Sequence, residues 1–171
     1  MGMVHLMRVV HVVAGAFWVG AVTLLAFVIL PAVMALGPAG GSFLEQVTRV
    51  RKLPIILNLA TVLTILSGVG LYWRDSGGFS AAWIRTGTGM TFGLGGILGI
   101  VIAIIGAAVN APAGIRLGAL AGEIRASGGP PTAAQQAEMV RLQNRLRGAS
   151  VAAAVLLLVA TALMAVARYV P

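Results

Sequence analysis

Cysteine is absent from this chain of 171 residues, and charged residues make up only 9% of it. The lack of cysteine excludes disulfides, CxxC redox motifs and thiolate metal sites. The scarcity of charge excludes an ordinary soluble domain, in which about 25% of residues are charged. Hydrophobic residues account for 59% of the chain instead. This balance is typical of a polytopic membrane protein.

Acidic residues are the second scarcity, with four of them against twelve basic residues and a net charge of +8. No carboxylate pair, Ser-His-Asp set or phosphate-binding loop occurs, which argues against hydrolytic chemistry. We expect every acid to lie outside the hydrocarbon, so none is available for a proton relay within the membrane. No basic nucleic-acid-binding motif appears, and we expect no nucleic-acid partner.

Four apolar segments each reach the ~20 residues that a spanning helix needs. They predict helices at about 3–36, 53–73, 83–125 and 133–170, within one transmembrane domain that covers residues 1–171. The predicted fold class is all-α, an integral membrane four-helix bundle. Between the first two helices, the sequence predicts a turn at 37–42 and a short polar helix at 43–52. Thr132 followed by Gln135 matches a capping box at the start of the last helix.

Basic residues are divided unevenly between the two ends of this bundle. Eight of the twelve lie in the first and third connections, whereas the opposite end has four, namely Arg8, Arg74, Arg85 and Arg168. Because cytoplasmic loops carry the excess of Lys and Arg, we expect the eight to face the cytoplasm. Both termini then lie on the outer side of the inner (plasma) membrane, and the lipid bilayer surrounds the chain.

The first helix is the most informative segment because it combines apolar residues with His5, Arg8 and His11. A polar group in hydrocarbon costs several kcal/mol unless it finds a partner. Under the predicted topology, side chains that suit a soft metal or haem iron share one layer near the outer face, within roughly 5 Å in depth. They are His5, Met7 and His11 on the first helix, Met90 on the third and Met164 on the fourth, and Arg8 lies in the same layer.

His11 has three interpretations, which the sequence leaves open. It can be an axial haem ligand, with Met90 or Met164 as the second ligand and Arg8, Arg85 or Arg168 near the propionates. It can bind copper together with Met3, Met7 and His5, since thioether and imidazole suit Cu(I). It can also be a structural histidine that bonds to a neighbouring helix. His5 and His11 face directions about 120° apart, so one straight helix cannot supply both axial ligands to one iron.

The third helix is rich in glycine, with GxxxG spacings at Gly89/Gly93 and Gly95/Gly99. Such spacings allow close helix contact. We expect close packing within the bundle, with a dimer seam or room for a flat cofactor as the alternatives. We also expect a homo-oligomer or a subunit of a larger membrane complex.

The order of His11, Trp18, Gly20 and Pro31 resembles the first helix of the CopD-like membrane domains of the copper-resistance D superfamily. The stretch 164–169, which holds Met164 and Arg168, is similar to the small four-helix relatives of that group. The resemblance implies copper handling or haem-dependent redox chemistry. The copper-transport members are larger and have additional helices and histidines.

These observations lead to one leading hypothesis and two alternatives. The leading one is a haem b site near the outer face, with His11 as ligand, in a protein of electron transfer. The first alternative is copper binding, and the second is a cofactor-free accessory subunit of a membrane complex.

Overall fold

The computed structural model describes residues 2–171, and the regular secondary structure of that range is helical throughout. Four stretches of it are long and apolar enough to cross a membrane, at Met3–Ala35, Leu53–Asp75, Gly87–Ser127 and Ala133–Tyr169. The prediction of an all-α chain with four transmembrane helices is therefore confirmed. Lipid surrounds these helices, and the protein is a multi-pass membrane protein.

Prolines shape two of the four spanning stretches. The first consists of α1 (Met3–Leu24), the π-helical turn η1 (Leu25–Ile29) and α2 (Leu30–Ala35). Pro31 has no N–H, and its ring crowds the carbonyl four residues earlier. The wider π turn accommodates that missing bond and keeps the helix continuous. The same device, η3 (Gly106–Asn110), precedes Pro112 in the third stretch.

The first connection differs from its prediction. Residues 37–42 do not form a turn, because α3 (Pro38–Glu45) already begins at Pro38 and continues as the π-helical η2 (Gln46–Val50). Gly37 alone reverses the chain, with φ of 54°, a region that glycine enters without steric cost. Pro38 then occupies the first turn, where a missing N–H costs nothing. Lys52 makes the next turn, with φ of 53°, and α4 (Leu53–Asp75) follows.

The third stretch begins later than the expected residue 83. A short α5 (Ala81–Ile84) stands apart, and α6 (Gly87–Ile105) begins after Thr86, whose Oγ1 accepts a hydrogen bond from the Gly89 N–H at 3.0 Å. This cap fixes the start of α6. After η3, α7 (Ala111–Ser127) ends at Gly128, which has φ of 66°.

The last helix begins with the capping box that the sequence predicts. The Gln135 N–H donates to Thr132 Oγ1 at 3.2 Å, and the Thr132 N–H donates to Gln135 Oε1 at 3.0 Å. Two N–H groups of the first turn are thereby satisfied. The helix is α8 (Ala133–Val166), and the 3-10 turn η4 (Ala167–Tyr169) follows it.

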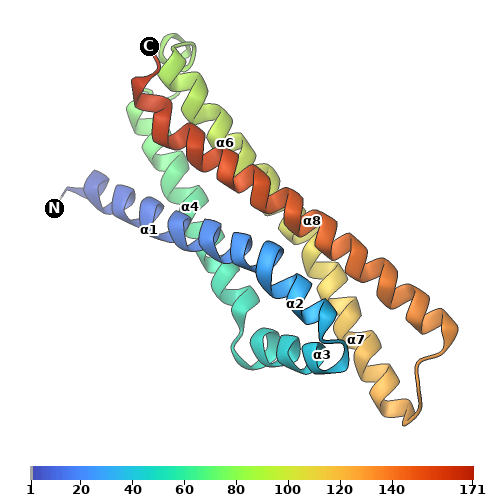
Figure 1. Ribbon diagram of the computed structural model, residues 1–171. Coiled ribbons are helices and arrows are strands. Elements are labelled where there is room, and N and C mark those ends of the chain that lie inside the picture. Colours follow the sequence, from blue (N-terminus) through green and yellow to red (C-terminus); the bar gives the residue numbers. More distant parts are fainter. Residues whose placement is uncertain (1) are drawn as a thin grey trace.

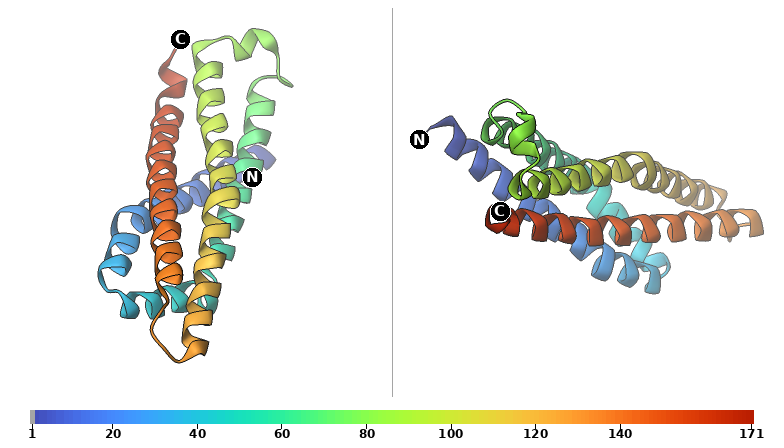
Figure 2. Two further views of the ribbon diagram at one scale, coloured as in Figure 1. Left: turned by 90° about the vertical axis from the view of Figure 1, so that its right-hand side faces the viewer. Right: turned by 90° about the horizontal axis from the view of Figure 1, so that it is seen from above.

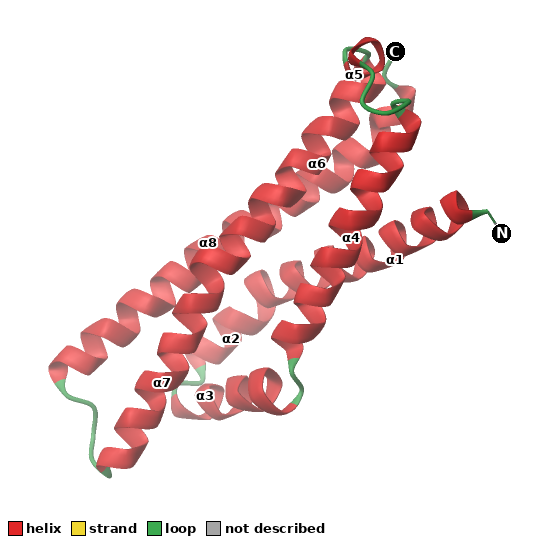
Figure 3. Cartoon of the chain, turned by 180° about the vertical axis from the view of Figure 1, so that it is seen from behind, coloured by secondary structure: helices red, strands yellow, loops and turns green. Residues whose placement is uncertain are grey.

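The four stretches form two helix pairs that meet in one core. In the ribbon views, α6 and α8 run side by side, whereas α1 crosses the bundle and its first turns stand apart from the end where α6 begins and α8 finishes (Figures 1 and 2). The α7–α8 connection lies at the end opposite to α5 (Figure 3). α1 packs mainly on α4, and α6 mainly on α8. The pairs join through Trp18, Ala60, Ile102, Ala153 and Leu157.

Candidate cofactor site on the first helix

His11 is attached to the neighbouring helix by a directed hydrogen bond. Its Nδ1 lies 2.8 Å from the backbone carbonyl oxygen of Thr64 on α4. A carbonyl oxygen can only accept, so Nδ1 must carry the proton. Ser67 Oγ lies 3.5 Å from the same nitrogen and donates its own proton to the Leu63 carbonyl. These contacts fix the tautomer and the orientation of the imidazole.

In the neutral imidazole with the proton on Nδ1, the other ring nitrogen, Nε2, keeps its lone pair. Within residues 2–171 the hydrogen bonds of His11 involve Nδ1 alone. His11 is half-buried, and Nε2 is not among the fully buried polar atoms of that range that lack a partner. A neutral imidazole with a fixed Nδ1–H and an accessible Nε2 is the form in which histidine coordinates a metal.

Small residues on α4 bring the helix close to this side of α1. A Cβ added at Gly68 would lie 2.8 Å from His11 Cε1, and the methyl group of Met7 occupies the position where a Cβ of Gly70 would stand. Gly15, one turn after His11, faces Thr64 in ordinary van der Waals contact. His11 and Met7, one turn apart, therefore point toward the same segment of α4.

A shallow apolar groove runs along one side of the α1–α4 contact. Its volume is about 480 Å³, and its lining includes Val10, the residue before His11, but not His11 itself. All of its lining side chains are apolar: Val9, Val10, Val13, Ala14 and Phe17 from α1, and Ile56, Leu59, Ala60 and Leu63 from α4. The groove offers dispersion contacts and no polar partner, which suits an apolar, flat or chain-like group.

The remaining predicted ligands on α1 are exposed. Met3 is 71% exposed at the first position of the helix, and His5 is exposed with Gly2 beside its ring. Arg8 is also exposed and lies one turn before His11. The structure thus brings Met7 and His11 together against α4, and leaves His5 and Met3 outside that contact.

The predicted residues on the other helices lie in the α6–α8 half of the molecule. Met164 packs against Gly95 in the α6–α8 contact, and Met90 on α6 is 52% exposed. Arg85 follows α5 and Arg168 lies in η4, and both are exposed. The first turns of α1 diverge from this region (Figure 1). Residues 2–171 contain no group of three His, Cys, Asp or Glu side chains placed to hold a metal ion.

Sequence reasoning missed the residues of α4 that complete the His11 contact. Thr64 supplies a carbonyl, which no side-chain pattern announces. Gly68 had a detectable signal. Thr64 and Gly68 are small residues four apart in an apolar helix, and this spacing favours close helix contact. Three glycines of the predicted GxxxG spacings meet neighbours: Gly89 faces the backbone of Trp83 and Ile84, Gly93 faces Tyr72, and Gly95 faces Met164. Gly99 has open space around it.

No protein-family model matches this sequence, and neither a curated protein nor a solved structure matches it.

Proposed function

We propose that this chain is a membrane-embedded haem b protein of electron transfer, in which His11 coordinates the iron through Nε2. The observation that supports this most directly is the 2.8 Å hydrogen bond between His11 Nδ1 and the Thr64 carbonyl oxygen. Metal-bound histidines characteristically donate the other ring N–H to a carbonyl or carboxylate. The bond holds the ring in place and raises the basicity of the ligating nitrogen.

The surroundings of His11 fit a haem in two further respects. The apolar groove on the α1–α4 contact, which Val10 next to His11 helps to line, offers contacts to the face of a porphyrin. Arg8, exposed and one helical turn from His11, has the charge and the reach to meet a propionate. A bound haem would supply one-electron chemistry. The protein's own residues would bind it, orient it and keep its faces in an apolar setting.

Copper is a second candidate, favoured by the position of Met7. Its side chain lies against Gly70 on the same side of α1 as His11, which faces Gly68. A thioether and an imidazole one turn apart suit Cu(I). Met3 and His5 would have to turn toward them to complete such a site. The resemblance to CopD-like membrane domains is compatible with both candidates.

The topology is part of the same proposal. With eight basic residues at the end that carries the first and third connections and four at the other, the positive-inside tendency places the termini and His11 toward the outer face of the inner membrane. We infer that the protein works as an oligomer or as a subunit of a larger redox assembly, because the apolar groove on the α1–α4 contact is shallow and a bound group would need a further cover.

An absorption spectrum of the detergent-purified protein, expressed with ample haem supply, tests the proposal. We expect a Soret band, with sharp α and β bands after dithionite reduction, and metal analysis showing iron. His11→Ala should abolish these bands. His5→Ala is the matched control, because it removes an exposed histidine from the same helix, and it should retain them. Stoichiometric copper without a Soret band would contradict the haem proposal and support a Cu(I) site. A protein that contains neither iron nor copper would overturn both the haem proposal and the copper proposal.

A further inference from the structure

The end of the bundle opposite to the termini carries a large excess of positive charge. Eight basic and three acidic side chains lie there, which leaves a net charge of +5. The structure divides these eight cations into two groups, one paired with acids and the other without an acidic partner. Most of the unpaired cations lie nearer to the core of the bundle than the paired Arg116 and Arg125.

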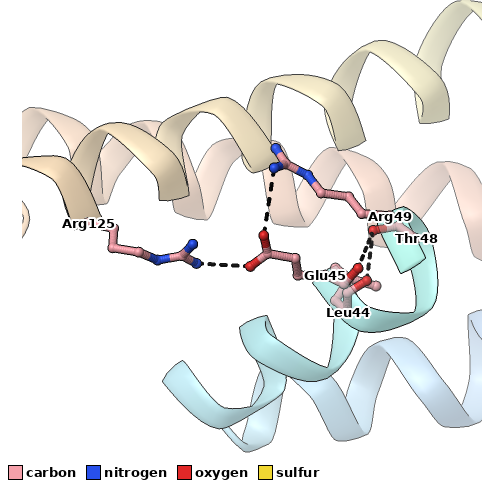
Figure 4. Close-up of polar contacts among 5 residues, drawn as sticks. All are labelled: Leu44, Glu45, Thr48, Arg49 and Arg125. Carbon is pink, nitrogen blue, oxygen red and sulfur yellow. Dashed lines mark hydrogen bonds and ion pairs between the residues drawn. The ribbon is translucent and has the colours of Figure 1, made fainter. Parts of the chain in front are cut away.

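The paired group uses all three acids of this end. Arg116 donates to Glu138 through Nε at 2.9 Å and to Glu123 through a terminal nitrogen at 2.7 Å. Arg125 donates to Glu45 at 2.9 Å, and Arg49 lies 3.6 Å from the other oxygen of that carboxylate (Figure 4). Glu45 thereby links α3 to α7, and Arg116 links α7 to α8.

The second group has no such partner. Five cations of this end form no ion pair within residues 2–171, and all five are exposed: Arg51, Lys52, Arg141, Arg145 and Arg147. Exposed apolar side chains stand beside two of them, with Val50 at 59% and Ile55 at 63% exposed. Basic residues next to exposed apolar ones are typical of the boundary between hydrocarbon and headgroups.

Depth along the helices distinguishes four of the unpaired cations, Arg51, Lys52, Arg145 and Arg147, from the paired Arg116 and Arg125. α4 has 23 residues and a length of about 35 Å, which matches the ~30 Å hydrocarbon core, so its start at Leu53 marks the boundary. Lys52 lies eight residues, about 12 Å, from the core layer at Ala60. Arg145 and Arg147 lie eight and six residues, about 12 and 9 Å, from Ala153 in the same layer.

The paired arginines stand further out. Arg116 and Arg125 follow the core residue Ile102 by 14 and 23 residues, about 21 and 34 Å along the helix. They are therefore beyond the boundary, where acids of the chain neutralise them. Arg51, Lys52, Arg145 and Arg147 form no ion pair within residues 2–171, and the phosphates of the bilayer occupy their depth.

We propose that Arg51, Lys52, Arg145 and Arg147 bind the phosphate groups of anionic phospholipids in the leaflet at this end of the bundle. Charge complementarity and depth together select this partner. Basic residues near an anionic membrane surface each contribute attraction. This surface would hold α4 and α8 in register with the leaflet, and it is independent of any cofactor at His11.

Spin-labelled lipids in vesicles of phosphatidylcholine containing the full-length protein test this proposal. The fraction of label immobilised at the protein gives its association relative to unlabelled lipid. We expect several-fold stronger association for phosphatidylglycerol than for phosphatidylcholine, decreasing as sodium chloride is added. Sodium phosphate at the same ionic strength should act no differently from chloride, because the site recognises headgroups held at the membrane surface.

Two double variants with equal loss of charge provide the control. Lys52→Gln with Arg147→Gln should reduce the preference for phosphatidylglycerol to near that for phosphatidylcholine. Arg49→Gln with Arg125→Gln removes the same charge from the paired group and should leave the preference largely intact. Equal loss in both variants, or no salt-sensitive preference in the unaltered protein, would overturn the proposal. Lys52→Arg, which keeps the charge, should behave like the unaltered protein.

Discussion

The two helix pairs of this bundle share one kind of packing contact, but only one pair contains a candidate functional residue. In each pair a methionine lies against a glycine of the partner helix, Met7 on Gly70 in α1–α4 and Met164 on Gly95 in α6–α8. Only the α1–α4 contact adds a titratable side chain with a directed hydrogen bond, from His11 to the Thr64 carbonyl. Small residues explain why both pairs are close. They do not explain why one pair contains an imidazole.

The difference shows how a functional group can be recognised inside an apolar bundle. Helices in lipid associate through van der Waals packing and small residues, without needing a histidine. His11 donates a hydrogen bond from one ring nitrogen to a backbone carbonyl and leaves the other ring nitrogen without a partner among residues 2–171. Helix packing alone does not require such a residue. The α6–α8 pair is the internal reference for packing alone, and the α1–α4 pair is the candidate site.

The largest expected loss of unfolding free energy is for Gly68→Ala, because the neighbour of this glycine is a rigid ring, whereas the neighbour of Gly95 is a flexible side chain. Gly68→Ala would place a Cβ 2.8 Å from His11 Cε1, in a ring fixed by its hydrogen bond, whereas Gly95→Ala would meet the mobile methyl group of Met164 at 2.9 Å. We expect Gly68→Ala to cost about 1–3 kcal/mol of unfolding free energy, and Gly95→Ala less. Gly96→Ala, with nothing within 4 Å, is the control. Reversible unfolding in mixed micelles measures all three, and equal costs would contradict the distinction.

The His11 bond itself should have a smaller effect on stability. His11→Phe keeps an aromatic ring but removes the donor to the Thr64 carbonyl, and we expect a loss of about 1 kcal/mol in unfolding free energy. Met164→Leu, the corresponding change in the other pair, conserves volume and polarity and should cost less than about 1.5 kcal/mol through packing alone. A combined variant should be additive, because the two sites lie in separate helix contacts. Strong coupling would mean that the two pairs are not independent.

A hydrogen bond from Tyr72 joins the two pairs and can be removed selectively. Its hydroxyl donates to the Gly89 carbonyl at 3.1 Å, and its ring packs edge-on against Trp83. Tyr72→Phe deletes the bond and keeps the ring, so we expect a loss of about 0.5–1.5 kcal/mol. Trp83→Leu, which leaves the hydroxyl bond in place, separates ring packing from hydrogen bonding in the same unfolding experiment. No change in Tyr72→Phe would show that this hydrogen bond adds nothing to the packing between the pairs.

The smallest expected effect concerns the ion pair between α3 and α7. The hydrogen bond from Arg125, and next its charge, lowers the pKa of Glu45 below its usual 4.5. A carboxylate with a lowered pKa stabilises the fold above its unfolded pKa and loses that contribution as the pH falls through the folded pKa. The α3–α7 contact should therefore persist at neutral pH and loosen below about pH 4.5.

Spin labels measure this contact conveniently because the chain has no cysteine of its own. Labels on Gln46→Cys and Gly122→Cys should report a longer or broader distance in acid, and the Glu45→Gln variant should show that distribution at every pH. A distance that does not change with pH in the unaltered protein would mean that the pair does not hold α3 in place. The effect is small because exposed ion pairs contribute little.

Much of the fold was predictable because its signals are local. Long apolar runs specify the four spanning stretches, and Thr132 with Gln135 specifies the start of α8. The helix from Pro38 was missed because glycines at positions 40 and 41 suggest a turn, whereas Gly37 alone makes it. For the site, His11 stood out as a polar residue in an apolar helix. Its partner did not, because a backbone carbonyl of α4 carries no sequence signal. The grouping of Met90, Met164 and the arginines with His11 stays a prediction.

The ring nitrogens of His11 give the most direct test of the account. In protein labelled with ¹⁵N-histidine and kept free of haem, we expect His11 to show a protonated Nδ1 and an unprotonated Nε2 in nitrogen magnetic resonance, assigned by comparison with His11→Ala. Added haem should shift or broaden the Nε2 signal of His11 and leave His5 unaffected. A protonated Nε2 before haem is added, or haem binding that leaves the His11 signals unchanged, would contradict the proposal that this nitrogen is the ligand.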